Sequence, residues 1–289
     1  MKMKCCIFIG MVISILSYTC CAYEKKTETP GMNMVLKNLS DTALEELGDS
    51  VIYIGKAIRN DDVSVFIEAS LADNHLYYVT FYVEGSGDVK PEVDSPNIDL
   101  IFSDNSELKT YVSYCSRVDI PEEATKSYYC LTYIRQTQES KAELKINSLF
   151  GSVNGKMFDF ENEEPIPVPF RVMKSLKSEG DDVFRNLSLS PLSGWIEHYG
   201  ITDPDHLKKN KPDHDIYICL KDNTRIGIEK EEFAEENTNL PFYADELPEK
   251  DHGIILIRFL HPMDIETVES IEIDGRNYKL SNLNSEDSE

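Results

Sequence analysis

Short apolar runs separated by polar turns follow one another along most of this chain. Each run is four to nine residues long and rich in Val, Ile, Tyr and Phe, which is the pattern of β-strands. The runs occupy residues 63–69, 76–83, 98–102, 110–118, 127–135, 142–150, 157–160, 183–189, 216–220, 224–228, 253–260, 268–273 and 277–280. Strands do not alternate regularly with long helices, which argues against a doubly wound parallel sheet. The pattern predicts an all-β protein.

The polar residues between several runs have the composition of tight hairpin turns. Asn, Asp and Gly tolerate the positive φ angles that two-residue hairpins need. Such pairs separate two runs at Asp73-Asn74, Asn154-Gly155, Asp222-Asn223 and Asp274-Gly275. One short helix is expected over residues 41–47, because Thr42 and Glu45 have capping-box spacing and Gly48 can end the helix.

A proline-rich segment divides the strand-rich part of the chain. Residues 163–169 read Glu-Glu-Pro-Ile-Pro-Val-Pro, and three alternating prolines favour an extended connector over a central strand. The units on either side, 34–165 and 166–282, have the size of immunoglobulin-like β-sandwiches, so two such domains in tandem are expected. Residues 23–33 are expected to be a polar tether, and the acidic tail 283–289 is expected to be disordered.

The first 22 residues have the pattern of an export signal. Lys2 and Lys4 precede an apolar run over residues 5–18, which is short for a membrane span, and small residues follow it. Three outcomes are open: a lipoprotein-like signal with lipidation of Cys21, cleavage after Ala22 to release a soluble protein, or an uncleaved anchor. Each of them places the bulk of the chain outside the cytoplasm, on the outer face of the membrane or secreted.

Four segments resemble the extracytoplasmic β-domains of unknown function found in Bacillota membrane-anchored, anti-sigma-factor-like proteins. They are the strand–turn–strand at 58–81, the segment 187–195, the hairpin at 216–226 and the closing unit at 259–275. The resemblance implies a sensing or binding ectodomain. Many members of that group carry a cytoplasmic segment before a membrane helix, whereas only four residues precede the apolar run here, so the anti-sigma role is not carried over.

The charge of the chain is strongly acidic. It has 52 Asp and Glu against 29 Lys and Arg, a net charge of −23, and the exported part without the leader carries 27 basic and 52 acidic residues, or −25. Phosphate binding needs clustered basic residues, so a nucleic-acid partner is excluded. Attachment to an anionic membrane through a basic patch is disfavoured for the same reason, and basic partners are favoured.

Three cysteines remain outside the leader: Cys115, Cys130 and Cys219. Cys115 and Cys130 lie in two predicted strands that can pair as a hairpin, which would set them opposite each other for a cross-strand disulfide in an oxidising compartment. The alternative is that both are free, buried and act as small hydrophobic residues. The sequence is compatible with both the disulfide and the two free thiols. Three cysteines do not make a disulfide scaffold, so a hydrophobic core must hold the fold.

No catalytic or cofactor-binding motif is recognisable in the sequence. The densest polar group contains the weak metal-site candidates His198, Asp203, Asp205, His206 and His214. Imidazole and carboxylate are common metal ligands, but the spacing matches no known ligand motif, so a solvated loop is the favoured interpretation. No catalytic, cofactor or metal residues are therefore assigned.

Aromatic residues offer a second candidate for binding. Packing is the favoured role for Trp195, the single tryptophan, and ligand stacking is the alternative. In Tyr77-Tyr78 and Tyr128-Tyr129, adjacent strand residues face opposite sides of the sheet, so one tyrosine of each pair is expected to face outward.

These patterns lead to one main functional hypothesis and two alternatives. The main hypothesis is an exported, surface-anchored, non-catalytic protein that binds or senses an unidentified extracellular or envelope ligand. A secreted hydrolase or carbohydrate-active enzyme is the first alternative, and a structural spacer or adhesion module is the second. The sequence does not decide the oligomeric state.

Overall fold

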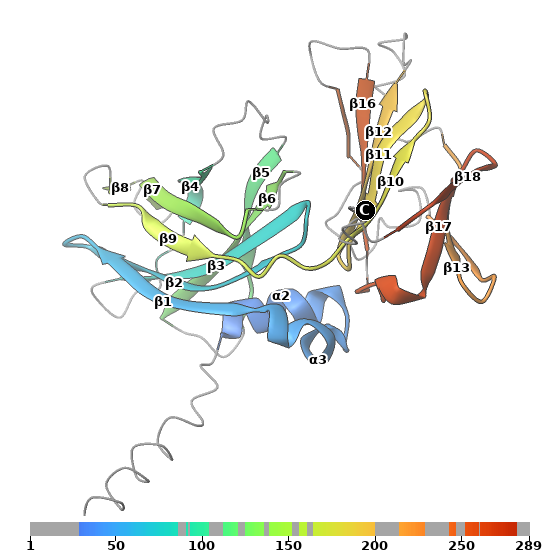
Figure 1. The fold of residues 1–289 in the computed structure, drawn as a ribbon. Coiled ribbons are helices and arrows are strands. Elements are labelled where there is room, and N and C mark those ends of the chain that lie inside the picture. The colour runs from blue at the N-terminus through green and yellow to red at the C-terminus, as the bar shows by residue number, and fades with distance from the viewer. Residues whose placement is uncertain are drawn as a thin grey trace, which may run out of the picture.

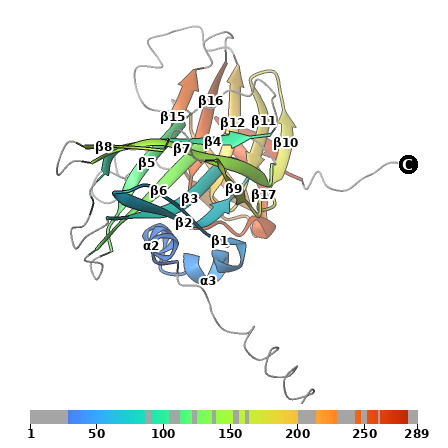
Figure 2. The ribbon, with the colours of Figure 1, turned by 90° about the vertical axis from the view of Figure 1, so that its left-hand side faces the viewer.

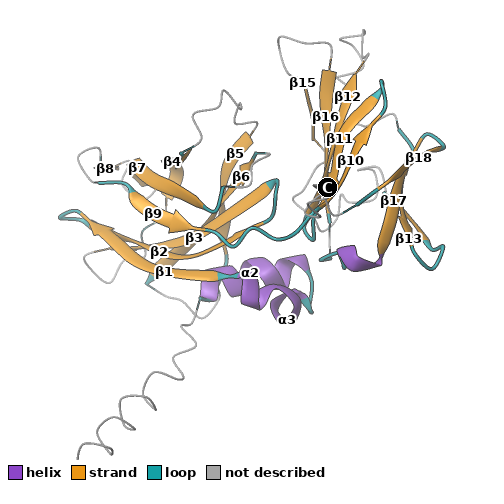
Figure 3. Cartoon of the chain, viewed as in Figure 1, coloured by secondary structure: helices purple, strands orange, loops and turns teal. Residues whose placement is uncertain are grey.

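The computed structural model shows an all-β protein with a pair of short helices near its start (Figures 1 and 3). It describes residues 29–85, 91, 93–103, 112–120, 125–135, 139–151, 156–160, 164–199, 214–228, 243–246, 252–259 and 261–281. The leader with Cys21, most of the tether and the acidic tail lie outside the described residues. The helices among the described residues are all too short or too polar to span a membrane.

The first unit consists of two facing antiparallel sheets. Sheet A has the strand order β1-β2-β3-β6-β5, and sheet B has the order β4-β7-β8 with β9 also paired to β7. The strands are β1 (Ile52–Arg59), β2 (Val63–Ala72), β3 (Leu76–Gly85), β4 (Val93–Phe102), β5 (Val112–Val118), β6 (Lys126–Ile134), β7 (Lys141–Gly151), β8 (Lys156–Asp159) and β9 (Ile166–Pro169).

The second unit repeats this plan. Sheet C has the order β10-β11-β12-β16-β15, and sheet D has the order β14-β13-β17-β18. The elements are β10 (Leu176–Gly180), β11 (Phe184–Leu189), β12 (Ser193–Tyr199), β13 (Ile216–Leu220), β14 (Arg225–Gly227), β15 (Tyr243–Glu246), β16 (His252–Arg258), the 3-10 helix η3 (Ile265–Thr267), β17 (Val268–Ile273) and β18 (Arg276–Lys279).

The two units correspond in most of their strands, whereas β9, which pairs with β7, and β14, which pairs with β13, do not match each other. Without the additional edge strands β1 and β10, the larger sheets read β2-β3-β6-β5 and β11-β12-β16-β15. The smaller sheets read β4-β7-β8 and β13-β17-β18. This is the order in which strands A-B-E-D and C-F-G lie in the constant-type immunoglobulin sandwich.

Turn chemistry is repeated between the units as well. The side chain of Asn60 accepts hydrogen bonds from two backbone N–H groups in the β1–β2 turn, and Asp181 does the same in the β10–β11 turn. The predicted turn residues Asn223 and Asp274 have positive φ. The predicted Asn154-Gly155 turn lies outside the described residues.

Each unit has its own apolar core between its two sheets. The core of the first unit is built from residues such as Val65, Phe81 and Leu144, and the core of the second from residues such as Leu187, Ile218 and Ile271. A third apolar cluster lies on the outer face of sheet A. This cluster joins the two units, because it contains Trp195 and Leu256 of sheet C in addition to residues of sheet A.

A helix that the sequence did not predict covers part of that outer face. Helix α2 (Pro30–Leu39) occupies the end of the expected tether and the start of the expected first domain, and it packs with α3 (Ala43–Leu47) beside sheet A (Figure 1). Met32 and Leu36 of α2 are fully buried. Helix α3 and the following 3-10 turn η1 (Gly48–Ser50) fall where the short helix was predicted to lie and end.

A buried carboxylate fixes the start of α2. Glu68 lies at an irregularity of β2, where the register shifts against both neighbouring strands, and it is only 1% exposed. Its oxygens accept hydrogen bonds from the N–H groups of Gly31 and Met32 and from the Thr80 hydroxyl. Burial raises the pKa of Glu68, and these donors oppose the rise. The carboxylate thus takes the place of a side-chain cap at the helix N-terminus.

The proline-rich segment is part of the first unit and not the connector that the sequence suggested. Strand β9 pairs with β7, with Pro167 opposite Glu143 and Pro169 opposite Lys141. Alternating prolines fit an edge strand, because the missing N–H groups are those that would face away from the sheet. The passage to the second unit is residues 171–175, and Val172 in this passage bridges to Ala72 at the end of β2.

The outer face of sheet A is covered along most of β3 and β6. Tyr77 and Tyr129 point into the core of the first unit, whereas Tyr78 and Tyr128 belong to the third cluster. All four are buried, so the expectation that one tyrosine of each pair faces solvent is wrong. Alternation predicted the two faces correctly, but α2 and α3 lie beneath the outer one (Figure 2), and residues of the second unit such as Trp195 pack there as well.

Candidate functional site

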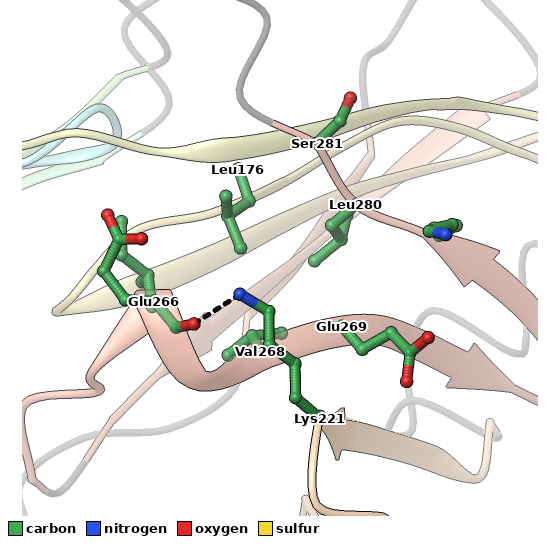
Figure 4. Close-up of a pocket in the computed structure, with 9 residues that line it drawn as sticks. Leu176, Lys221, Glu266, Val268, Glu269, Leu280 and Ser281 are labelled. Atoms are coloured by element: carbon green, nitrogen blue, oxygen red, sulfur yellow. Dashed lines mark hydrogen bonds between the residues drawn. The ribbon is translucent and has the colours of Figure 1, made fainter.

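A surface pocket in the second unit is the candidate ligand site (Figure 4). Its volume is about 320 Å³, which is the lower end of the range for small-molecule sites. It lies where the start of β10, the β13–β14 turn, η3, the start of β17 and the end of β18 meet. The lining residues are Leu176, Lys221, Ile265, Glu266, Val268, Glu269, Lys279, Leu280 and Ser281.

The pocket combines an apolar floor with charged groups of both signs. Its four aliphatic side chains are buried, whereas its lysines, glutamates and serine are exposed. Lys221 reaches from the turn into the pocket, and its ammonium group donates a hydrogen bond of 2.7 Å to the backbone carbonyl of Glu266. In Figure 4 the carboxylates of Glu266 and Glu269 lie on either side of Lys221. The pocket therefore offers cationic donors and anionic acceptors around one apolar surface.

The structure brings together two of the predicted metal-site candidates. The rings of His198, at the end of β12, and His214, before β13, are 4.5 Å apart between centroids, and Phe184 packs against both. Nδ1 of His214 lies 2.6 Å from the Asp274 carboxylate, which also accepts from the N–H of Asp215. Asp203, Asp205 and His206 lie outside the described residues.

This histidine pair joins the two sheets of the second unit. Burial, and next the charge of His214, lower the pKa of His198 to about 4, so His198 is neutral near pH 7. Within the part of the chain that the structure describes, no three His, Cys, Asp or Glu side chains are grouped to hold a metal ion. The contacts that the pair makes are with Phe184 and Asp274, which are structural partners.

A buried chain of polar side chains lies between the two units. We call Asp73, His75, Ser188 and Ser193 the joint. Ser188 Oγ lies 2.6 Å from His75 Nε2, His75 Nδ1 lies 2.8 Å from Ser193 Oγ, and Ser193 donates to Asp73 over 2.7 Å. All four residues are at most 1% exposed, and Trp195 stacks on His75 with ring centroids 5.6 Å apart.

The joint contains the residue types of a hydrolytic triad but lacks the arrangement that hydrolysis needs. The carboxylate contacts Ser193 and not the imidazole, and no member is accessible to a substrate. Burial, and next the charge of Lys177, lower the pKa of His75 to about 3, so the imidazole is a poor base at neutral pH. Trp195 packs here, as expected, rather than in a ligand site.

Cys115 and Cys130 are both free in the structure. Cys115 pairs with Leu131 and Cys130 with Ser116, so the hairpin register is one residue away from the arrangement that would set the cysteines opposite each other. Cys115 faces the core of the first unit and Cys130 faces the third cluster on the other side of the sheet. Burial raises the pKa of both thiols, to about 12 for Cys130, so neither is a reactive thiolate.

Sequence reasoning missed the pocket and the joint. The pocket is assembled from segments that are up to about a hundred residues apart, and none of its residues forms a motif. For the joint one signal was present: Asp73-Asn74 was predicted as a turn. Its burial under a second unit depends on how the units pack, which the pattern of a single turn does not contain.

Comparison with known proteins gave limited similarity. No protein-family model matches the sequence, and no curated protein matches it. The crystal structure of the conserved domain protein from Bacillus anthracis aligns over 79% of this chain and 78% of that chain, with 10% identity and a TM-score of 0.48. The N-terminal periplasmic domain of ScsB from Proteus mirabilis aligns over 81% and 97%, with 11% identity and a TM-score of 0.23. At these TM-scores neither similarity supports a conclusion about function.

Proposed function

We propose that this chain is an exported, membrane-anchored, non-catalytic binding protein built from two immunoglobulin-like sandwiches in tandem. The pocket of the second unit is the observation that carries the proposal. It has the size and the mixed lining of a small-ligand site, with an apolar floor and a few polar groups that can orient a ligand. The repeated strand order supports the tandem, and the burial of the joint supports a role without catalysis.

The lining of the pocket selects a class of ligand. Two ammonium groups and two carboxylates surround four aliphatic side chains, so a small zwitterion with an aliphatic part matches both its charges and its floor. A carboxylate on the ligand would bind at Lys221, and an ammonium group would bind at Glu266 or Glu269. An anion or a cation alone would satisfy only half of these groups.

Calorimetric titration with leucine tests this function. Leucine should bind, whereas isocaproate, which lacks the amine, and isoamylamine, which lacks the carboxylate, should bind at least about tenfold more weakly, since each leaves charged partners without a counterpart. Lys221→Met should weaken leucine binding by a similar factor. Lys141→Met, on the first unit, serves as the control and should bind as the unchanged protein does. Absence of leucine binding, or equal binding by Lys221→Met, contradicts a zwitterion site here.

The position of α2 bears on the proposed anchor. If Cys21 is lipidated, only eight residues separate it from Pro30, where α2 begins. Eight extended residues span at most about 29 Å, so the first unit would stay close to the membrane surface. Labelling cells with a click-ready fatty acid tests the anchor: the chain should be labelled and the variant Cys21→Ser should not. Unlabelled protein in the medium contradicts lipidation.

Charge bears on the proposed partners. Removal of the leader leaves a net charge of −25, which favours basic partners and repels anionic surfaces. Association with a basic partner should therefore weaken steeply as the salt concentration rises.

A further inference from the structure

The turn between β2 and β3 of the first unit is inserted against sheet C of the second unit. Asp73 and His75, which are 0% exposed, lie in this turn, and both serines of the joint belong to sheet C. The three hydrogen bonds between side chains of the joint therefore all cross from one unit to the other: Ser188 to His75, His75 to Ser193, and Ser193 to Asp73. Separation of the two units would therefore break all three hydrogen bonds together.

The direction of donation along the joint follows from the acceptor at its end. Ser193 donates its proton to the Asp73 carboxylate, so its oxygen accepts from Nδ1–H of His75. His75 Nε2 then has no proton and accepts from the Ser188 hydroxyl. Asp73 also accepts from the N–H groups of His75, Leu76 and Leu192. Each polar group of the joint thus has a partner, which is what makes a buried polar network stable.

Other contacts between the units surround the joint. Asn74 donates to the hydroxyl of Ser175 in the connector, and Arg258 donates to the Tyr78 hydroxyl over 3.2 Å. Trp195 and the neighbouring aliphatic side chains of sheet C pack against the outer face of sheet A, so the polar chain lies in an apolar surrounding. The connector itself is tied to β2 through the Ala72–Val172 bridge.

We infer that the joint locks the two sandwiches at one fixed angle, so that they unfold as one cooperative body. Tandem domains in one chain ordinarily move relative to each other unless their interface is large and apolar. Here an interleaved, fully satisfied polar chain inside an apolar cluster removes that freedom. The position of the pocket relative to the start of the first unit is consequently fixed.

Calorimetry and limited trypsin digestion of the full chain test this inference together. The unchanged protein should unfold in a single thermal transition, and trypsin should cut slowly after Arg171 and Lys174 in the connector. His75→Leu leaves the buried Ser188 hydroxyl without its acceptor and removes the donor to Ser193, which keeps only its bond to Asp73. It should split the transition into two and speed cutting of the connector at least about tenfold, since cleavage follows the population of the open form.

Two further variants keep the test decisive. Ser190→Ala is the matched control, because Ser190 is a buried serine in the turn between β11 and β12 whose Oγ has no hydrogen-bond partner among the described residues. It should behave as the unchanged protein. Ser188→Ala removes only one donor and should shift cutting in the same direction if His75→Leu does not fold. Two transitions in the unchanged protein, or the same cutting rate in Ser188→Ala and Ser190→Ala, overturn the inference.

Discussion

The two units share one strand order but differ in what covers the outer face of their larger sheet. In sheet A that face lies under α2, α3 and the second unit, so β3 and β6 are buried on both sides over most of their length. Among the described residues of sheet C, those that pack against the first unit lie around Trp195 and Leu256, and the end of β12 at His198 and Tyr199 is partly exposed. The larger sheet is thus an inner layer of the molecule in the first unit and an outer layer in the second.

This difference separates the roles of the two units. Each unit is a sandwich whose core is closed by its own two sheets, so neither core needs the other unit to exclude water. The second unit packs against the outer face of sheet A, so the first unit is the more enclosed of the two. The second unit, with less cover, keeps the exposed ends of strands that form the pocket.

Removing the cover from sheet A should have the largest effect. Leu36→Ala removes a fully buried side chain of α2 and should lower the free energy of unfolding by about 2–5 kcal/mol, because it leaves a cavity against sheet A. Leu44→Ala in α3 is the matched control: Leu44 is 46% exposed, and the change should stay within about 0.5 kcal/mol. Urea denaturation measures both. Equal, small effects would mean that the helices are not an integral part of the first unit.

Acid should weaken the contact between the units through His75. The pKa of His75 is about 3 in the folded protein and 6.5 without burial, so between these values the unfolded chain binds a proton that the folded chain does not. Stability contributed by neutral His75 is therefore lost as the pH falls below about 6.5, by up to about 1.4 kcal/mol per pH unit.

The comparison of variants isolates this contribution from the carboxylates. Glu68 and Asp73 have raised pKa values, so their contribution to the pH dependence of stability has the opposite sign to that of His75. The slope of stability against pH must therefore be compared between the unchanged protein and its variants. His75→Leu should flatten the slope between pH 6 and pH 4. His198→Leu should flatten it less, because His198 is only half-buried. A slope that His75→Leu leaves unchanged would show that His75 titrates normally.

The edge strands β1 and β10 offer a smaller, matched test. Gly55 and Gly180 both have positive φ, and a Cβ at Gly180 would lie 1.9 Å from the carbonyl oxygen of Phe184. The atoms nearest to a Cβ at Gly55 would belong to the side chain of Tyr53, which is 43% exposed and able to move. Gly55→Ala should cost about 1–2 kcal/mol from the backbone angle alone, and Gly180→Ala should cost more in the same urea titration. The reverse order would mean that the β10–β11 turn yields more easily than β1.

The thiols should give the smallest effect. Alkylation of the unfolded, unreduced chain followed by mass spectrometry should label Cys115 and Cys130 fully, because they face opposite sides of sheet A. Prior reduction should change nothing. A mass lower by two hydrogens, with both sites protected, would show that the bridge forms and that the hairpin register differs from the one described.

Strands with strong alternation were predicted closely, and most of the missed strands lie at sheet edges, although the edge strands β5, β14 and β18 were predicted. The predicted runs match β2, β3, β6, β7, β11 and β17 closely, since these strands bury branched and aromatic side chains. Strands β1, β9, β10, β12 and β15 were missed. Four of them lie at sheet edges or are short and polar. A solvent-exposed position tolerates most side chains, so the alternation of apolar and polar residues is weaker there. Central β12 was missed because it opens with Ser-Gly and ends in polar residues.

The sequence did not predict the pocket, and of the weak metal-site candidates only two are described by the structure. The sequence placed His198 and His214 near each other, and the structure brings them into contact. It could not show that Asp274, singled out as a turn residue, would be the partner of His214. Lys221 and the floor of the pocket carried no signal, because an exposed lysine and buried aliphatic residues occur throughout any sandwich.

The sequence by itself determined the fold class, the positions of several hairpins, the acidic character and the export pattern of the leader. Each of these depends on local periodicity or on composition, which neighbouring residues fix among themselves. Only the tertiary structure decided that β9 belongs to the first unit, that α2 replaces the end of the tether, and that Asp73 and His75 are buried in a joint with two serines of sheet C. Those outcomes depend on which surfaces are covered by distant parts of the chain. Burial of an outer sheet face is a property of the packed units, and the alternation along one strand is the same whether that face meets water or another domain.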